Sequence, residues 1–161
     1  MPKQRAGSIK SVLLITCAAI MVLASAFPAW GALGGDVASV QADQAHMQGT
    51  RQTIPAQSYT VHEIQAATGE VVREYVSSAG TVFAVAWHGP WLPDMRQVLG
   101  SYFEQYTQAA KAQSGTRMGR RPLVIEQPGL VVESGGHLRA FSGKAYVPDM
   151  LPTGVRAEDI Q

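Results

Sequence analysis

Histidines and carboxylates are the residues of this chain that could do chemistry near neutral pH, and His88 is the foremost candidate. It follows an apolar run and precedes a Gly-Pro pair, with Asp94 soon after it and His137 able to come near in a folded sheet. A histidine beside a carboxylate can act as a general acid–base pair. No nucleophile accompanies the three residues. We therefore favour a simpler interpretation, in which His88 ends a strand and Asp94 caps a helix.

The catalytic alternative stays a hypothesis: a small periplasmic hydrolase or isomerase that uses His88, Asp94 and His137. The four histidines do not stand at the spacings of a metal site, and the chain has no H-E-x-x-H motif. It also lacks a G-x-S-x-G motif, a P-loop and a G-x-G-x-x-G motif. We therefore predict no catalytic residues, no metal ligands and no cofactor.

Aromatic residues beside His88 suggest a binding surface instead. Trp87, His88, Trp91 and Tyr146 could together form a patch that binds a glycan or a segment of a partner protein. Such aromatic residues belong more often to the core or to its rim. A second feature is a basic loop over residues 113–122, which could contact an anionic lipid or polysaccharide, although a solvated loop is the simpler interpretation.

The stretch 71–94 indicates how such residues are positioned. Residues 71–76 and 81–87 are rich in β-branched and aromatic residues, which predicts two strands joined by a Ser-Gly turn. Large residues (Phe83, Val85 and Trp87) alternate with small ones (Ala84 and Ala86) in the second strand. The small face would let another element approach closely. Charges on the first strand, in Arg73-Glu74, are explained by cross-strand pairing.

A helix is expected from Asp94 to about residue 112. Its apolar stripe has the spacing of one helical face and consists of Met95, Val98, Leu99, Tyr102, Phe103 and Tyr106. Asp94 is the expected N-cap. Gly100 inside the stripe costs about 1 kcal/mol relative to alanine and suggests a close contact between helix and strand.

The remaining segments complete an α+β fold. Asp36 could cap a short helix along Val37, Val40 and Met47, residues 50–58 read as a polar connection, and residues 59–64 alternate as a strand. Further strands are expected at 123–126, 130–133 and 137–146, with a turn at residues 134–136, a bulge at Gly143 and a loosely held tail after Pro148. We predict an antiparallel sheet of five or six strands, the main helix on one face, and the short helix on the other face or an edge.

Residues 1–31 have the layout of an export signal. Three basic residues precede an apolar run, and small residues follow it. Ala29-Trp30-Gly31 fits a cut before Ala32, and a cut after Ala26 is the second candidate. An uncleaved membrane anchor is the alternative, because the run approaches spanning length. The expected organisation is a signal peptide over 1–31 and one domain over 32–161.

Composition limits the classes of function. Cys17, the only cysteine, lies inside the apolar run, so a processed chain would have neither a disulfide nor thiolate chemistry. The 161-residue chain has 13 basic and 12 acidic residues, and loss of the signal would leave ten basic against twelve acidic. No concentrated basic face is apparent, which argues against nucleic-acid binding.

Several short motifs together resemble a known family. They are A-L-G-G at 32–35, R-E-Y-V at 73–76, G-T-V-F-A-V-A-W-H-G-P at 80–90, P-D-M at 93–95, L-G-S-Y-F at 99–103 and H-L-R-A-F-S-G-K-A-Y-V-P at 137–148. The pattern is similar to that of the domain of unknown function (DUF) 2844 family of short exported bacterial proteins. The resemblance implies a periplasmic or secreted location. It implies no activity and carries over no functional residues.

We therefore expect a non-catalytic exported protein that binds or assists an envelope component, with an envelope protein or a glycan as its partner. Contact with the membrane is expected only through the signal segment, if that segment stays uncleaved.

Overall fold

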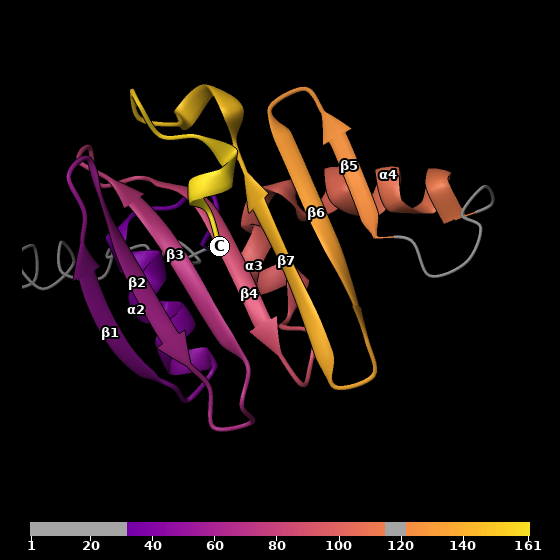
Figure 1. Cartoon of the computed structure of the whole chain (residues 1–161), viewed down its shortest axis with the longest axis horizontal. Coiled ribbons are helices and arrows are strands. Elements are labelled where there is room, and N and C mark those ends of the chain that lie inside the picture. The colour runs from indigo at the N-terminus through magenta and orange to yellow at the C-terminus, as the bar shows by residue number, and fades with distance from the viewer. Residues whose placement is uncertain (1–31, 115–121) are drawn as a thin grey trace, which may run out of the picture.

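One antiparallel sheet of seven strands organises the molecule (Figure 1). The structure is a computed structural model that describes residues 32–114 and 122–161. The strand order is β1-β2-β3-β4-β7-β6-β5. The strands are β1 (Thr50–Pro55), β2 (Tyr59–Gln65), β3 (Val71–Ser77), β4 (Val82–Gly89), β5 (Leu123–Gln127), β6 (Leu130–His137) and β7 (Ala140–Tyr146). The predicted α+β class and antiparallel sheet are confirmed, with slightly more strands than expected.

The additional strand is β1, which the sequence suggested was a polar connection. It pairs along its whole length with β2 and forms an edge of the sheet. Five of its six residues are exposed, so it lacks the apolar alternation by which a strand is recognised. Polar composition and a proline are typical of edge strands, which must avoid pairing with other chains.

The turn between β6 and β7 also differs from the prediction. The glycines at 134–136 lie within β6, and the chain reverses at Leu138-Arg139, where Arg139 has a φ of 63°. Gly143 pairs in regular register with Trp87 rather than forming a bulge. A Cβ at Gly143 would lie 2.4 Å from Cζ2 of the Trp87 ring. The glycine is there because an indole ring covers it.

All the α-helices of the described chain cover one face of the sheet (Figure 1). Helix α2 (Val37–His46) lies over β1–β3, and α3 (Met95–Leu99) and α4 (Phe103–Ser114) lie over the rest. The predicted caps are both present, because one carboxylate oxygen of Asp36 accepts from Ala38 and Ser39, and one of Asp94 from Arg96 and Gln97. The expectation that α2 covers the other face or an edge is wrong.

The main helix is interrupted where Gly100 stands. Gly100 takes a φ of +52°, and a short 3₁₀ segment, η2 (Gly100–Tyr102), joins α3 to α4. Glycine reaches this conformation without the steric strain of a Cβ. The predicted apolar stripe nevertheless faces the sheet: Met95, Val98 and Leu99 are buried, and the aromatic residues that follow pack against the same core.

The opposite face of the sheet is covered by the segment after β7, which contains η3 (Pro148–Met150) and η4 (Ala157–Asp159) (Figure 1). Ile160 is 2% exposed and packs with Tyr75, Phe83, Ala84 and Ala86. The small face of β4 does admit another element, as expected. The prediction of a loosely held tail is wrong. The prolines and charged residues of this segment suggested an irregular tail, but Ile160 packs into the core and holds the segment on the sheet.

A bulge in β4 explains why Phe83 joins this second core. Tyr75 pairs with Ala84 and the next residue, Val76, pairs with Val82, so Phe83 is an extra residue in β4. An extra residue shifts the alternation of side chains between faces. Phe83 therefore points away from Val85 and Trp87, contrary to the predicted large face, and its ring contacts Tyr59 and Tyr75.

Candidate functional site

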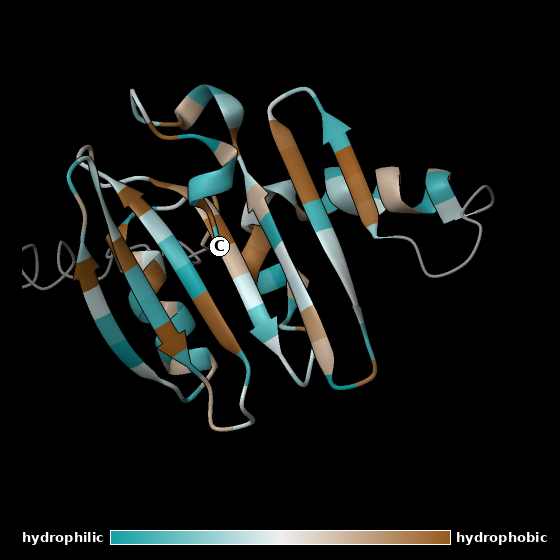
Figure 2. Ribbon diagram, in the orientation of Figure 1, coloured by the Kyte–Doolittle hydropathy of each residue, from teal (hydrophilic) through white to brown (hydrophobic). Residues whose placement is uncertain are grey.

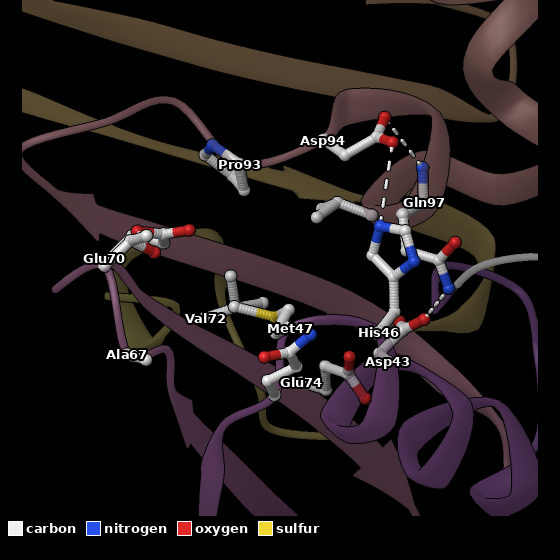
Figure 3. Close-up of a pocket in the computed structure, with 13 residues that line it drawn as sticks. Asp43, His46, Met47, Ala67, Glu70, Val72, Glu74, Pro93, Asp94 and Gln97 are labelled. Atoms are coloured by element: carbon white, nitrogen blue, oxygen red, sulfur yellow. Dashed lines mark hydrogen bonds and ion pairs between the residues drawn. The ribbon is translucent and has the colours of Figure 1, made fainter.

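A cavity of about 340 Å³ opens between the helices and the middle of the sheet. Its walls come from the C-terminal half of α2, from β3, from the turn between β2 and β3, and from the start of α3 (Figure 3). Four carboxyl groups line it: Asp43, Glu70, Glu74 and Asp94. Among the described residues that line it, His46 alone can carry a positive charge.

Asp43 and Glu74 form the floor of this cavity. Asp43 comes from α2 and Glu74 from β3, and their side chains converge in Figure 3. Asp43 is 2% exposed and Glu74 is fully buried. Figure 2 shows a hydrophilic band in the middle of β3, between hydrophobic ends. Two carboxyl groups are thus buried against each other beneath the helices.

This pair holds its protons unusually tightly. Burial raises the pKa of Glu74 to about 9, and the neighbouring Asp43 carboxyl adds to the rise, whereas the Arg51 guanidinium opposes it. Burial also raises the pKa of Asp43, although hydrogen bonds from Glu74 and Gln97 oppose the rise. Two carboxylates in contact repel each other strongly when both are ionised. At neutral pH Glu74 is therefore a neutral acid that donates a hydrogen bond to Asp43.

The hydrogen bonds of the floor are incomplete. Among the described residues, neither carboxyl oxygen of Glu74 has a hydrogen-bond donor, and Oδ2 of Asp43 has none. A proton shared between the two side chains satisfies one oxygen of each. Oδ1 of Asp43 accepts from Nε2 of Gln97 on α3, which ties α2 to α3 (Figure 3).

Residues 32–33 run against α3. Ala32 is fully buried, and its backbone N–H donates to the carbonyl of Gln97 over 3.1 Å. The next residue, Leu33, donates to the carbonyl of Val98. Burial raises the pKa of Asp43, and the Ala32 backbone opposes that rise.

A second pair, His46 and Asp94, lies above the floor. Nε2 of His46 is 3.9 Å from Oδ2 of Asp94, and both side chains are about half exposed (Figure 3). The other Asp94 oxygen, Oδ1, caps α3. The carboxylate of Asp94 therefore has a structural task already, and an exposed pair at this distance contributes little to stability.

Behind the floor, a polar row continues along the sheet toward the edge strand. Glu74 pairs in register with His62 on β2, and His62 pairs with Thr53 on β1. Nδ1 of His62 lies 3.2 Å from the hydroxyl of Thr53. Burial lowers the pKa of His62, and nearby Arg51 lowers it further, so this imidazole is neutral at pH 7. His62 therefore supplies no positive charge to balance the carboxyls.

Two loops in contact form one side of the cavity mouth. A Cβ at Gly89 would lie 2.6 Å from Cα of Glu70, and its φ of +152° suits glycine alone. The loop then continues through Trp91 and Leu92, which are 51% and 45% exposed, into Pro93 and Asp94, which line the cavity. A large aromatic and a large aliphatic side chain thus stand exposed next to the acidic mouth.

The four residues of the predicted aromatic patch do not share one surface. Trp87 is 2% exposed and belongs to the core beneath the helices, whereas Tyr146 packs into the core on the opposite face. Trp87 and exposed His88 do line one cavity, of about 330 Å³, near the end of β4. Of the two tryptophans and the tyrosine, Trp91 alone is exposed.

The structure does not gather His88, Asp94 and His137. Asp94 lines the acidic cavity and His88 lines the second cavity. His137 lines neither, and its Nδ1 is near the carbonyl of the adjacent Leu138. The histidine that does approach Asp94 is His46, which is far from it in sequence. The hydrolase hypothesis thus has no geometric support.

Sequence reasoning missed the acid pair, although its signal was present. Val72 and Val76 flank Glu74 at the period of a strand, and both are buried. Asp43 stands at helical spacing between Val40 and Met47, on the face that meets the sheet. A carboxylate that occupies a position of an apolar stripe is expected to be buried with that stripe. The predicted cross-strand pairing does hold for Arg73, which binds Glu63 at 2.7 Å.

Three further observations bear on the predicted partners and cofactors. In the described parts of the chain, no group of three or more histidine, cysteine or acidic side chains could hold a metal ion. No helix in those parts is long and apolar enough to cross a membrane. Most of the predicted basic loop, with Arg117, Arg120 and Arg121, lies outside the described residues, as does the predicted signal over 1–31.

Chemically, the site combines a neutral acid, a hydrogen-bonded carboxylate and an acidic mouth. A carboxylic acid that stays protonated at neutral pH can donate a hydrogen bond or a proton. Glu74 is fully buried, however, so it acts first on Asp43. The ionised groups at the mouth favour cations.

The fold and cavity define an α+β protein in which helices cover one face of an antiparallel sheet and enclose a buried acid pair. The chain belongs to the family described as "Protein of unknown function (DUF2844)", whose profile matches residues 29–160. This confirms the family resemblance seen in the sequence. Comparison with curated proteins and with solved structures found no match.

Proposed function

We propose that this protein is a non-catalytic binding module, exported to the periplasm or beyond the cell, that holds a basic segment of an envelope protein. The observation that carries the proposal is the mouth of the acidic cavity. Asp94 is exposed and Glu70 half-buried there, and the neighbouring Trp91 and Leu92 are exposed in a loop that the fold holds in place.

The chemistry of this mouth favours a lysine or arginine side chain. Carboxylates attract the cationic head group, and an exposed tryptophan offers its ring face to the same cation. Leu92 supplies apolar area for the stem of such a side chain. An acidic or neutral glycan would satisfy fewer of these groups, so a basic protein segment is the better fit.

Export is supported by the sequence of residues 1–31, with its basic start, apolar run and small residues before Ala32. Residues 32–161 contain no cysteine, so a protein released into the periplasm or outside the cell would need no disulfide to fold.

Site-specific photo-crosslinking in the native envelope tests this proposal. A crosslinking residue replaces Leu92 in the exported protein, and a matched control replaces Leu138, which is 82% exposed in the turn between β6 and β7. We expect a defined adduct at position 92 that weakens about tenfold or more in Trp91→Ala and in Glu70→Gln, as for a hot spot worth more than about 1.4 kcal/mol.

Adduct formation at position 92 should also fall with added salt, because screening weakens attraction between exposed charges. Equal adducts at positions 92 and 138 would contradict the proposal, and so would adducts indifferent to both substitutions. An adduct that a glycosidase removes would identify a glycan instead of a protein segment.

A further inference from the structure

The carboxyl groups at the mouth of the acidic cavity have hydrogen-bond donors that those at its floor lack. At the mouth, Oε2 of Glu70 accepts from the hydroxyl of Thr68 at 2.6 Å, and Oδ1 of Asp94 caps α3. At the floor, both carboxyl oxygens of Glu74 and Oδ2 of Asp43 have no donor from outside the pair among the described residues. The mouth can attract a cation, but the unsatisfied acceptors lie at the floor.

Both floor residues are buried and yet form part of the cavity wall. Glu74 is fully removed from solvent and Asp43 is 2% exposed, and their carboxyl groups converge in Figure 3. Glu74 keeps its proton at pH 7, because burial and the adjoining Asp43 carboxyl raise its pKa to about 9. The pair therefore carries one negative charge. A buried charge is destabilising unless an opposite charge or enough hydrogen bonds compensate it.

The cations near the pair do not supply the missing donors. The charge of His46 acts on Asp43, and that of Arg51 acts on Glu74. His46 is half exposed, however, with its Nε2 directed toward Asp94, and Arg51 belongs to the edge strand β1. Neither residue donates a hydrogen bond to the three oxygens that lack one. A cation that enters through the cavity can do so.

We infer that the floor binds the ammonium group of a lysine side chain, which enters through the mouth and donates to Glu74 and Asp43. The lysine belongs to the basic segment of the proposed function, on which this inference rests. The cavity wall also includes Met47, Val72 and Val98, which suit the alkyl stem of that side chain. The cavity volume of about 340 Å³ is within the range of ligand sites in proteins.

The acceptors at the floor favour an ammonium over a guanidinium. Oδ1 of Asp43 already accepts from Gln97, and the proton shared by the pair occupies one further oxygen on each residue. One oxygen of Glu74 is then left without a donor. A guanidinium binds best through two parallel hydrogen bonds to one carboxylate, which neither carboxyl group can offer here. An ammonium is a compact charge whose three donors can point to separate acceptors.

Access to the floor requires movement of side chains. Met47 is half-buried at the C-terminal end of α2, and methionine has three rotatable bonds through which it can move aside. His46 is half exposed, and its 3.9 Å approach to Asp94 contributes little to holding it in place. The backbones of α2 and β3 can therefore stay where they are when the lysine enters.

Titration with butylamine, which reproduces the end of a lysine side chain, is the first test. NMR follows the side-chain carboxyl ¹³C shifts of Asp43 and Glu74 in the exported protein at pH 7. We expect butylamine to shift both signals, whereas butanol, which has the same chain length and no charge, should shift neither. Butylguanidine should bind about tenfold more weakly, as for the loss of a hydrogen bond to a charged group.

This titration needs no variant. Carboxyl signals that butylamine leaves unchanged would overturn the inference, and so would equal responses to butylamine and butanol. Binding of butylguanidine as tight as that of butylamine would overturn the preference for lysine.

A substitution at the floor is the second test. Asp43→Asn removes the charge of the pair, and Asp36→Asn is the matched control at the exposed N-cap of the same helix, where asparagine also caps well. We expect Asp43→Asn to weaken butylamine binding about tenfold or more, read from the Glu74 carboxyl signal, and Asp36→Asn to leave it unchanged. Unweakened binding in Asp43→Asn, or equal weakening in both variants, would overturn the inference.

The crosslink at position 92 separates this inference from the proposed function. A lysine anchored at the floor predicts that Asp43→Asn weakens the adduct about tenfold and that Asp36→Asn does not. If Asp43→Asn leaves the adduct unchanged while butylamine binds at the floor, the lysine anchor is overturned, the occupant is a free amine, and the proposed function stands. If no adduct forms at position 92 while butylamine binds, the proposed function is contradicted and the ammonium site is supported.

Discussion

Strand β3 presents Glu74 to one face of the sheet and Arg73 and Tyr75 to the other, and the two faces treat these polar groups differently. On the face covered by the C-terminal segment, the guanidinium of Arg73 binds Glu63 and the main-chain oxygen of Gln161. The hydroxyl of Tyr75 donates to that oxygen and accepts from the N–H of Gln161. Every one of these groups is paired.

On the face covered by the helices, Glu74 is fully buried beside Asp43, and three of the four carboxyl oxygens of the pair lack a donor from outside the pair among the described residues. Adjacent residues of one strand thus show two uses of polarity. One face uses it to fasten a segment to the sheet. The other keeps an electrostatic imbalance beneath an open cavity, which is where a functional group is expected.

The largest expected effect concerns the face of the sheet that the C-terminal segment covers. Ile160→Ala removes the apolar anchor of the C-terminal segment and should cost about 3 kcal/mol of unfolding free energy, because the side chain is almost fully buried. Urea denaturation measures it. Leu138→Ala, at a site 82% exposed, is the control and should change the free energy little. Equal effects of the two substitutions would show that the segment does not dock.

The second prediction concerns pH and the helix-covered face. The pKa of Glu74 is about 9 when folded against an ordinary 4.5, so the folded chain binds the extra proton between these values. Stability should therefore fall as pH rises through this window, by at most about 1.4 kcal/mol per pH unit. Glu74→Gln cannot titrate, so it should flatten the profile and be roughly 2 kcal/mol more stable than the wild type at pH 8.

Denaturation curves at intervals from pH 5 to about pH 9 check this. Glu126→Gln, at an exposed position on the edge strand β5, is the matched control and should keep the wild-type profile. If the unfolding free energy of the wild type does not fall as pH rises, or if the fall persists in Glu74→Gln, the acid pair is not the source of the pH dependence.

The smallest expected effect also concerns the face that the C-terminal segment covers. Tyr75→Phe keeps the ring packed against Phe83 and removes only the hydroxyl with its two hydrogen bonds to Gln161. The expected loss is about 1 kcal/mol, the usual net value of such bonds. Hydrogen exchange should quicken at the amide of Gln161 and not at amides of α2. Unchanged exchange at Gln161 would indicate that the hydroxyl does not hold the segment.

The sequence predicted local features well and long-range meetings poorly. Asp36 and Asp94 were identified as caps because a cap depends only on residues two or three positions away. The stripe of the main helix was identified for the same reason. The docking of Ile160 and the strand character of β1 depend on partners that are distant in sequence, and no local pattern encodes them.

The candidate site shows the same limit. The sequence analysis assigned Glu74 to cross-strand pairing and did not single out Asp43, and no local pattern could show that α2 would bring the two carboxyls together. It placed Trp87 and Tyr146 on one surface because it could not show the bulge and the pairing that send them to opposite faces. It did identify Trp91, whose exposure follows from its short loop.

The most direct test of the account is an NMR titration of the Glu74 side-chain carboxyl in the isotopically labelled, exported protein. The carboxyl ¹³C shift of Glu74 should stay that of a neutral acid through pH 7 and change only well above neutrality, toward the pKa of about 9. A midpoint near the ordinary value of 4.5 would mean that the floor of the cavity is hydrated and fully ionised. The buried neutral acid beneath the helices would then be contradicted.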